Sequence, residues 1–431
     1  MKLFNNPSRS QWKELVKRPT LELSHLDSTV KNILTRVKEL GDSALLEFAW
    51  QFDRVKLSDI LVSEDEIQEA ITSVDEKLKA AIEQAHQNIY KFHDAQKTEP
   101  LDVETMPGVV CSRRTVAIDK VGMYIPGGSA PLFSTVLMLG IPAKIAGCPD
   151  VILCTPPMDN GAINAAILFT ANLVGIRKIF KVGGAQAIAA MTYGTETIPA
   201  VYKIFGPGNQ YVTKAKQLVS MEGIAIDMPA GPSEVLVFAD EHANADFIAA
   251  DLLSQAEHGA DSQVMLVTTS PSLPEKVSHA IEIQLAQLSR RKIAEQALLN
   301  SRCLVFESDD DAFDFINTYA PEHLIINCAD AEAKLGKVSN AGSVFLGAFT
   351  PEAAGDYASG TNHTLPTNGY AKAYSGVSLN SFQKAITVQR ITKEGLKSLG
   401  SVVEVMAEAE NLLGHKNAVS IRLKNISDEN I

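Results

Sequence analysis

The sequence predicts an α/β protein with two doubly wound domains and helical extensions at its N- and C-termini. Short β-branched runs alternate with small-residue helices between residues 121 and 227, and a second alternation follows between residues 234 and 346. Such alternation is typical of βαβ units, whose strands form a parallel, Rossmann-like sheet. The length agrees with two domains, because 431 residues exceed a usual single hydrophobic core.

The N-terminal part of the chain is predicted to be helical. Asp27 and Ser28 can cap a helix, and the apolar residues that follow recur at helical spacing. We expect helices near residues 11–17, 28–52 and 64–92. Residues 101–121 are strand- and turn-like instead. These segments are interpreted as packing elements rather than as sites of chemistry.

Three strands of the first alternation end in turns that are rich in glycine or proline. The turns are Ile125–Ser129, Val182–Gln186 and Phe205–Asn209. Each lets the backbone approach a ligand at the carboxyl end of a strand and directs a helix N-terminus at it, which suits a phosphate. The complete G-x-G-x-x-G fingerprint is absent, and any α/β fold needs such turns. A nucleotide site and plain turns therefore remain alternatives at this point.

Residues 229–261 combine a turn, an apolar strand at 234–239 and an Ala/Leu-rich helix. Gln255 and His258 stand three apart near the end of this stretch, and side chains at that spacing share one face of a helix. Such a pair can offer two ligands to one metal ion. A solvated polar stripe explains the same spacing, so both interpretations stay open.

The second alternation completes the predicted organisation. Its strands are expected at 263–269, 303–307, 323–328 and 343–346, with helices at 274–298, 310–319 and 331–338. Because strand 234–239 begins after the first alternation has ended, we expect the N-terminal helices to join this second layer. The predicted parts are an N-terminal extension (1–24), a discontinuous α/β domain (25–120 and 231–380), an inserted nucleotide-binding domain (121–230) and a C-terminal tail domain (381–431).

Composition narrows the class of partner. The formal net charge is -12 and no block of Lys or Arg stands out, which argues against nucleic acid or a membrane. The opening residues lack the apolar core of a signal peptide. The scattered cysteines form no CxxC motif, so we expect reduced thiols and a cytoplasmic protein. These cysteines are Cys111, Cys148, Cys154, Cys303 and Cys328.

Glu322 and His323 place an acid and an imidazole just before a predicted strand. Neighbouring side chains on an extended segment point to opposite sides, so these two could divide two proton-transfer tasks. The alternative is that His323 simply caps the strand.

Further polar candidates lie toward the C-terminus. Asp356 and His363 belong to the Gly-rich segment 350–381, whose length favours a functional loop over a plain surface loop. Glu410 and His415 lie near the end of the last predicted helix. A solvated carboxylate and a histidine beside a helix C-terminus explain that pair equally well.

A series of long segments, in order along the chain, resembles the histidinol dehydrogenase family. They are VGMYIPGGSAPLFSTVLMLGIPAKIAGC, VGGAQAIAAMTYGT, KIFGPGNQYV, AGPSEVLV, DLLSQAEHG, APEHL, AGDYASGTNHTLPT and AEAENLLGHKNAVSIR. The resemblance covers essentially the whole chain from about Val30 to Leu423. It implies oxidation of L-histidinol through L-histidinal to L-histidine with two molecules of NAD, the last two steps of histidine biosynthesis.

The resemblance also implies one zinc ion per subunit. Its protein ligands fall here on Gln255, His258, Asp356 and His415, with the imidazole and amino nitrogens of the substrate completing the shell. A nitrogen and oxygen ligand set without thiolate would also accept manganese or cobalt. The ion would mainly orient the substrate.

The remaining implied roles concern proton transfer, substrate and cofactor. His323 is the implied base for the hydroxyl proton, and Glu322 is the implied activator of the water that adds to the aldehyde. The implied substrate contacts are Ser233, Gln255, His258, His323, Asp356, His363, Glu410 and His415. The implied NAD contacts are Tyr124, Gln186 and Asn209.

The family resemblance further implies a homodimer in which the C-terminal tail crosses to the partner, so that Glu410 and His415 serve the neighbouring site. Two rival interpretations remain. A metal-dependent hydrolase would use Glu322 or His323 to activate a water on the metal and would not need NAD. A nucleotide-binding protein without catalysis would bind NAD and would not depend on His323.

Overall fold

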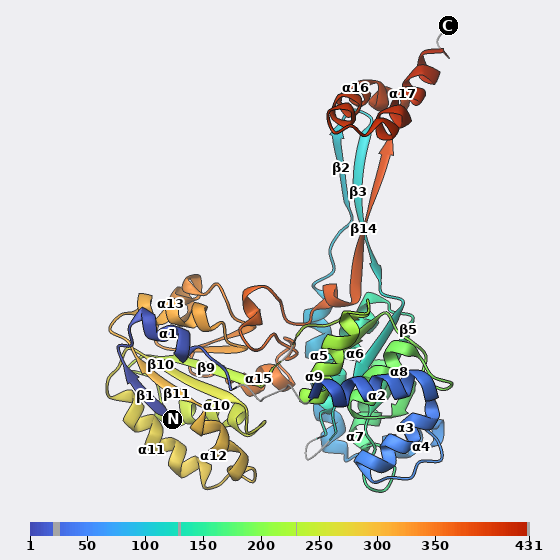
Figure 1. Ribbon diagram of the computed structural model, residues 1–431. Coiled ribbons are helices and arrows are strands. Elements are labelled where there is room, and N and C mark those ends of the chain that lie inside the picture. Colours follow the sequence, from blue (N-terminus) through green and yellow to red (C-terminus); the bar gives the residue numbers. More distant parts are fainter. Residues whose placement is uncertain (20–25, 128–130, 230, 429–431) are drawn as a thin grey trace. The chain divides into compact units, whose positions relative to one another are not determined.

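The computed structural model describes residues 1–19, 26–127, 131–229 and 231–428 (Figure 1). Contacts divide the chain into two compact units. Unit 1 comprises Met1–Gln96 and Ile118–Phe382, and unit 2 comprises Lys97–Ala117 and Gln383–Ile431. Gly128 and Ser129 of the first glycine-rich turn, and Ala230 at a predicted domain boundary, lie outside the described residues.

One parallel sheet of unit 1 has five strands in the order β6-β5-β4-β7-β8. The chain order reverses between β4 and β7, which makes the sheet doubly wound with a switch point there. Its strands are β4 (Lys120–Tyr124), β5 (Asp150–Thr155), β6 (Lys178–Lys181), β7 (Lys203–Phe205) and β8 (Ala225–Ile226). The helices between them are α6 (Phe133–Ala146), α7 (Ala165–Val174), α8 (Gly184–Tyr193) and α9 (Gln210–Ser220).

The second parallel sheet of unit 1 has six strands in the order β1-β11-β10-β9-β12-β13. Its switch point lies between β9 and β12. The strands are β1 (Lys2–Asn5), β9 (Glu234–Ala239), β10 (Gln263–Thr268), β11 (Arg302–Val305), β12 (His323–Asn327) and β13 (Ser343–Leu346). The predicted fold class, two doubly wound Rossmann-like layers, is confirmed.

Central strand β9 shows how this second layer is built. All six of its residues are buried, and successive side chains alternate between the two faces. Val235 and Val237 face the core under α10 (Ala245–Ala256), α11 (Leu273–Leu285) and α12 (Arg291–Leu299). Leu236 and Phe238 face the core that contains residues of α1 (Arg9–Leu15) and α13 (Asp309–Tyr319). Helix α14 (Ala331–Lys334) precedes β13.

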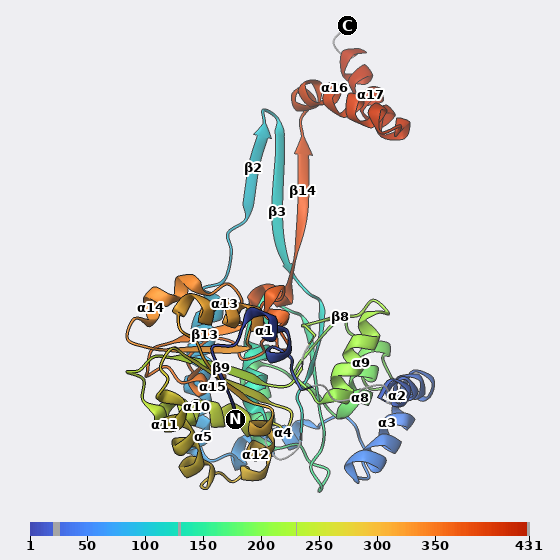
Figure 2. The ribbon, with the colours of Figure 1, turned by 60° about the vertical axis from the view of Figure 1, so that its left-hand side comes forward.

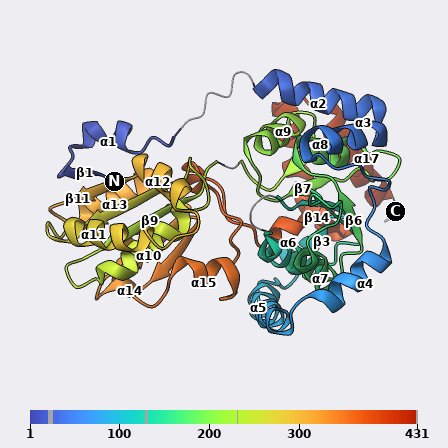
Figure 3. The same cartoon turned by 90° about the horizontal axis from the view of Figure 1, so that it is seen from below.

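The N-terminal helices pack on the five-stranded sheet and not on the six-stranded one, where we expected them. The apolar stripe of α2 includes Val30, Ile33, Leu34 and Val37, and it joins the core formed by α8 and α9. Figure 3 shows α2 beside these two helices. The other N-terminal helices are α3 (Asp42–Phe48), η1 (Ala49–Asp53), α4 (Glu64–Ser73) and α5 (Glu76–Asp94), and α2 itself spans Leu26–Leu40.

Two further segments differ from expectation. Residues 1–15, expected as an extension, supply edge strand β1 and helix α1 of the six-stranded layer. The long helix expected over 274–298 is two helices, α11 and α12, separated at residues 286–290. A straight helix of that length would run about 37 Å, well beyond a six-residue strand of about 20 Å, so the second half must turn back to stay buried.

Unit 2 joins two separate parts of the chain. Strands β2 (Leu101–Met106), β3 (Val109–Ala117) and β14 (Gln383–Ile391) form an antiparallel sheet in the order β14-β3-β2. Helices α16 (Lys393–Ala409) and α17 (Leu413–Asp428) pack together at one end of these strands (Figures 1 and 2). Residues 101–117, assigned above to the first α/β domain, therefore pair with the tail. Among the described residues, no helix has the length and apolarity needed to cross a membrane.

Candidate active site

Glu322 and His323 both reach the first residue of β9. Glu322 Oε2 accepts the backbone N–H of Glu234 at 2.8 Å, and His323 Nδ1 lies 3.0 Å from the Glu234 carbonyl oxygen. The two side chains approach each other to 3.6 Å. The expectation that they point to opposite sides is wrong, because β12 begins only at His323 and Glu322 lies in a bend after Ala320, which has φ 54°.

The hydrogen bonding of His323 identifies its reactive nitrogen. Gln255 Nε2 lies 3.3 Å from the same Nδ1, but the Glu234 carbonyl oxygen is nearer and can only accept, so we place the Nδ1 proton toward Glu234. Buried Nε2 has no hydrogen-bond partner and lies 3.4 Å from Asp356 Oδ1. Burial lowers the pKa of His323, but the carboxylates of Glu322 and Asp356 outweigh this effect and raise the pKa well above its ordinary value. Nε2 is therefore the atom that can exchange a proton with a substrate.

A buried ion pair between Arg18 and Glu234 holds the residue whose backbone Glu322 and His323 contact. The Arg18 guanidinium donates to both carboxylate oxygens of Glu234 at 2.9 and 2.8 Å, with both side chains buried. Arg18 also stacks over the ring of Tyr319 at 3.6 Å, and the N–H of Asn368 donates to Glu234 at 2.6 Å. The sequence pattern gave no signal for this pair, since its members are 216 positions apart.

Gln255 and His258 lie at the end of α10. The helix ends at Ala256, and the N–H of His258 donates to the Gln255 carbonyl oxygen at 3.2 Å, which continues the turn. Gln255 is buried and its Oε1 has no hydrogen-bond partner. The atoms packed around His258 lower its pKa, while the Asp356 carboxylate acts in the opposite direction. The predicted same-face pair is therefore one buried amide and one more accessible imidazole.

Asp356 comes from α15 (Glu352–Tyr357), within the segment that was expected to be a long loop. Burial alone would raise the pKa of Asp356, but the neighbouring His323 imidazole lowers the pKa overall. Glu352, one turn earlier on α15, is buried, and burial raises its pKa. Ligand-type atoms of His323, Glu352 and Asp356 lie within 4.8 Å of one another. Sequence reasoning missed Glu352, although its spacing from Asp356 is that of two residues on one helix face.

These residues fit a divalent metal ion. The unpartnered Gln255 Oε1 is a buried acceptor, and the imidazole of His258 and the carboxylate of Asp356 complete a nitrogen and oxygen donor set. Three of the four implied ligands thus lie in unit 1. The fourth, His415, is an exposed residue of unit 2, in the first turn of α17, and Glu410 is exposed at the end of α16.

His363 is held between two other segments of unit 1. Its Nδ1 lies 2.7 Å from the Asp356 carbonyl oxygen and its Nε2 lies 3.0 Å from Thr135 Oγ1 on α6. Neighbouring Asn362 donates to the Met138 carbonyl oxygen at 2.6 Å. The segment 350–381 is therefore packed against α6 rather than being a surface loop, and it includes the short helices η3 (Tyr370–Lys372) and η4 (Leu379–Phe382).

A cavity of about 910 Å³ opens beside His258 and Ser233. Ser233, His258 and Asn209 are among its lining residues, and Ser233 Oγ lies 3.5 Å from His258 Nδ1. Ser233, Glu322 and His323 stand at the amino ends of β9 and β12. The six-stranded sheet therefore departs from the rule that ligands of doubly wound sheets lie at the carboxyl ends of strands.

The residues implied for NAD follow that rule on the five-stranded sheet. Tyr124 ends β4, Gln186 lies in the first turn of α8 after β6, and Asn209 caps α9 after β7. Tyr124 and Gln186 are buried, and the Tyr124 hydroxyl oxygen accepts the N–H of Gly184 at 3.2 Å. Asn209 Oδ1 accepts the N–H groups of Tyr211 and Val212. The three residues thus shape the turns at which two helices begin.

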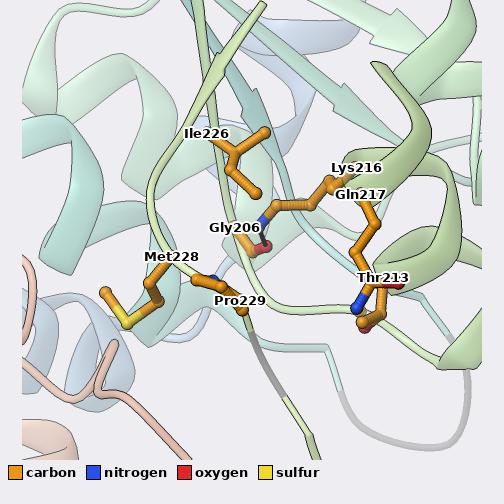
Figure 4. A pocket seen from close by; sticks show the side chains of 8 residues that line it. Gly206, Thr213, Lys216, Gln217, Ile226, Met228 and Pro229 are labelled. Carbon is orange, nitrogen blue, oxygen red and sulfur yellow. Dashed lines mark hydrogen bonds between the residues drawn. The ribbon is translucent and has the colours of Figure 1, made fainter. Parts of the chain in front are cut away.

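A buried ion pair between Lys216 and Asp227 fixes the turn that contains Asn209, and Figure 4 shows the hydrogen bond from Lys216 to Gly206 in this turn. Lys216 Nζ pairs with Asp227 and donates to the Gly206 carbonyl oxygen at 2.9 Å, and Asp227 accepts the Gly206 N–H at 2.9 Å. Gly206 has φ +125°, and a Cβ there would meet the Tyr124 carbonyl oxygen. Only glycine therefore suits this close approach between the ends of β4 and β7.

Replacing Lys216 by methionine should lower the free energy of unfolding by about 3–5 kcal/mol, because Asp227 would remain buried without its cation. The shift of the urea midpoint measures this loss. Lys214→Met is the matched control, since Lys214 pairs with the more exposed Asp27 and should cost at most about 1 kcal/mol. Equal losses in the two variants would contradict the role of the buried pair.

The chain matches known proteins along its full length. The family model for histidinol dehydrogenase matches residues 16–423. Histidinol dehydrogenase of Bacteroides fragilis is 60% identical over 426 residues, covering 99% of this chain and 100% of that protein. Histidinol dehydrogenase of Vibrio vulnificus is 53% identical over 428 residues, covering 99% and 98% of the two chains.

A solved structure agrees with these sequences. The crystal structure of histidinol dehydrogenase from Elizabethkingia anophelis has a TM-score of 0.97 and 56% identity to this chain, with 99% of each chain covered. Together with two doubly wound sheets and an acid–imidazole pair beside a nitrogen and oxygen donor cluster, this similarity identifies the family. The chain belongs to the histidinol dehydrogenase family.

Proposed function

We propose that the cluster around His323 oxidises L-histidinol in two steps, through L-histidinal to L-histidine, with one NAD reduced in each step. The observation that carries this assignment is the free Nε2 of His323, held beside Glu322 and surrounded by Gln255, His258 and Asp356. Family membership supplies the NAD-dependent dehydrogenase activity. The roles of individual residues are our proposal.

His323 acts as the general base in the first step. Its Nδ1–H is directed at the Glu234 carbonyl oxygen, which fixes the ring with Nε2 facing the cluster, and Nε2 accepts a proton when the imidazole is in its neutral form. Nε2 takes the hydroxyl proton of histidinol as a hydride leaves the carbinol carbon for NAD. The products of this step are the aldehyde, NADH and one proton.

Glu322 acts in the second step. Its carboxylate lies 3.6 Å from His323 and is oriented by the Glu234 N–H, so it can accept a proton from water as that water adds to the aldehyde carbon. The hydrate then loses a hydride to a second NAD and a proton to the protein. Burial raises the pKa of Glu322, as is common for carboxyl groups that exchange protons near neutrality.

Gln255, His258 and Asp356 would hold the metal ion, with His415 as the fourth protein ligand. When bound, the ion would orient the imidazole and amino nitrogens of the substrate and add positive charge beside the buried carboxylates. Ser233 and His363 are proposed to contact the substrate near this cluster, and Glu410 is proposed to do so together with His415. Zinc is proposed as the ion, with manganese or cobalt as substitutes.

The turns at the carboxyl ends of β4, β6 and β7 are proposed to bind NAD. The ion pair of Lys216 and Asp227 holds the turn at Gly206 through hydrogen bonds to its backbone. Asn209 lines the same cavity as Ser233 and His258. A cavity of about 910 Å³ is within the usual size range of cofactor sites. Tyr124 and Gln186 would shape the neighbouring turn.

Histidinol and excess NAD, incubated with the pure protein, provide the direct test. We expect two NADH per histidinol consumed, with histidine as the product. One NADH per histidinol with accumulating aldehyde would contradict the two-step assignment. A metal-dependent hydrolase would need no NAD, and a non-catalytic nucleotide-binding protein would produce no NADH at all.

We also propose a homodimer, because unit 2 leaves much of its apolar surface uncovered. Its buried apolar side chains, among the described residues, are Val109, Ala407 and Ile426. Exposed apolar side chains are more numerous on its strands and helices, and several exceed half exposure. They are Leu101, Val103, Ile386, Val388, Ile391, Val402, Val405, Met406, Leu412, Leu413 and Ile421. Such a surface is typical of an interface with a second copy.

Replacing Met406, which is 60% exposed on α16, by glutamate should convert the dimer into a monomer. A buried, unpaired carboxylate at the interface would oppose association. Sedimentation velocity measures the change. Met221→Glu is the control, because Met221 is 77% exposed in unit 1 and should leave the dimer intact. A dimeric Met406→Glu protein would remove this face from the interface.

The cellular compartment and the domain division are also proposals. The five cysteines are free, which agrees with a reducing cytoplasm. We propose that the chain functions as two α/β layers plus a tail domain. The helices of residues 26–94 belong with the inserted layer, and residues 97–117 belong with the tail.

A further inference from the structure

Glu352 contacts the end of α10 with both carboxylate oxygens. Gln255 Nε2 donates to Glu352 Oε1 at 2.5 Å, and Ser254 Oγ lies 3.1 Å from Glu352 Oε2. The Glu352 side chain is 1% exposed, so water does not compete for these bonds. Two consecutive residues of one helix are thus held by a single carboxyl group on another.

This contact decides which way the Gln255 amide faces. An amide group has one donating and one accepting end, and only the NH₂ end can donate to a carboxylate. Nε2 makes its shorter contact with Glu352 and lies 3.3 Å from His323 Nδ1, so Oε1 faces away from Glu352, and Oε1 is the buried atom that has no partner. A carbonyl oxygen oriented in this way is the end of the amide that can coordinate a metal ion.

We propose that Glu352 is a positioning residue that orients Gln255, so that the amide oxygen and not the NH₂ group faces the metal site. The inference rests on the proposed function, since it takes Gln255 as a ligand. Without Glu352 the amide can rotate about its last bond, and half of its orientations would present a donor to the cation. Groups that orient metal ligands commonly change metal affinity by about 10–100-fold when they are removed.

Two substitutions separate this role from others. Glu352→Leu removes the acceptor, and we expect zinc affinity to fall about 10–100-fold, measured by competition with a chromogenic chelator. Glu352→Gln keeps an amide oxygen that can accept from Gln255, so we expect affinity within a few-fold of the native protein. Glu332→Leu, which removes an exposed carboxylate in the same layer, should leave zinc affinity unchanged. Circular dichroism and the melting temperature show whether each variant is folded.

The absorption spectrum of the cobalt-substituted protein supplies a second readout. Positioning predicts an unchanged spectrum for Glu352→Gln, because its ligand set is complete. If Glu352 were itself a ligand, Glu352→Gln would lose affinity as Glu352→Leu does, and the cobalt spectrum would change, which would overturn the proposal. Native zinc affinity in a folded Glu352→Leu protein would also overturn it. Failure of the proposed metal site is distinguishable, since the native protein itself would then bind no zinc.

Discussion

The His323→Asn protein should turn over histidinol roughly 10²–10⁴-fold more slowly than the native protein, because it lacks the base that accepts the hydroxyl proton. Asparagine can still donate to the Glu234 carbonyl oxygen, so the end of β12 should remain in place. NAD binding should change little. Steady-state rates of NADH formation, together with NAD affinity from fluorescence titration, measure the two quantities separately.

His279→Asn is the matched control, since His279 is an exposed histidine on α11 and should leave the rate unchanged. Supplying histidinal in place of histidinol isolates the second step. Glu322→Gln should then be the more affected variant, because it removes the proposed proton acceptor for water and retains an acceptor for the Glu234 N–H. If the His323→Asn protein retained nearly native rates, the assignment of His323 as the base would be wrong. Its proposed pairing with Glu322 would then be wrong as well.

Sequence periodicity was sufficient for the fold class, because strand and helix patterns are local properties. The strands at 151–155, 178–182 and 234–239 follow from short apolar runs between turn residues, and the structure has strands there. Which sheet a helix covers is not local. Helix α2 presents an apolar stripe that either sheet could bury, and in the structure it packs against α8 and α9.

The site residues also fall into two groups: those that local spacing predicts to be close and those that only the tertiary fold brings together. Gln255 and His258 share a helical turn, so their proximity follows from spacing alone. The pairing of Glu322 with His323 did not follow from the alternation rule, because a bend before β12 overrides it. Arg18 and Glu234 are joined only by the tertiary fold. The resemblance to a known family supplied the roles of Asp356 and His415, which periodicity could not connect to α10.

The pairing of β14 with β3, within unit 2, has a further physical basis. Strand β14 is exposed along nearly its whole length and is completed only by β3, a segment that precedes it by more than 250 positions. A short strand with a polar and apolar alternation gives no indication of which distant strand will pair with it. Local sequence pattern therefore does not identify the strand with which residues 383–391 pair.

Mixing inactive His323→Asn subunits with inactive His415→Asn subunits should restore activity if the tail completes the neighbouring site. With equal, randomly exchanging subunits, half of the dimers are mixed and each mixed dimer contains one site with both native histidines, so activity should reach roughly a quarter of the native value. If each tail served its own subunit, every site would carry one substitution. Mixed dimers isolated with two affinity tags would then stay inactive, which would rule out the crossing tail. Glu410 at the end of α16 and His415 in the first turn of α17 are both exposed, which favours recovery, because ligands that complete a site must be free to reach it.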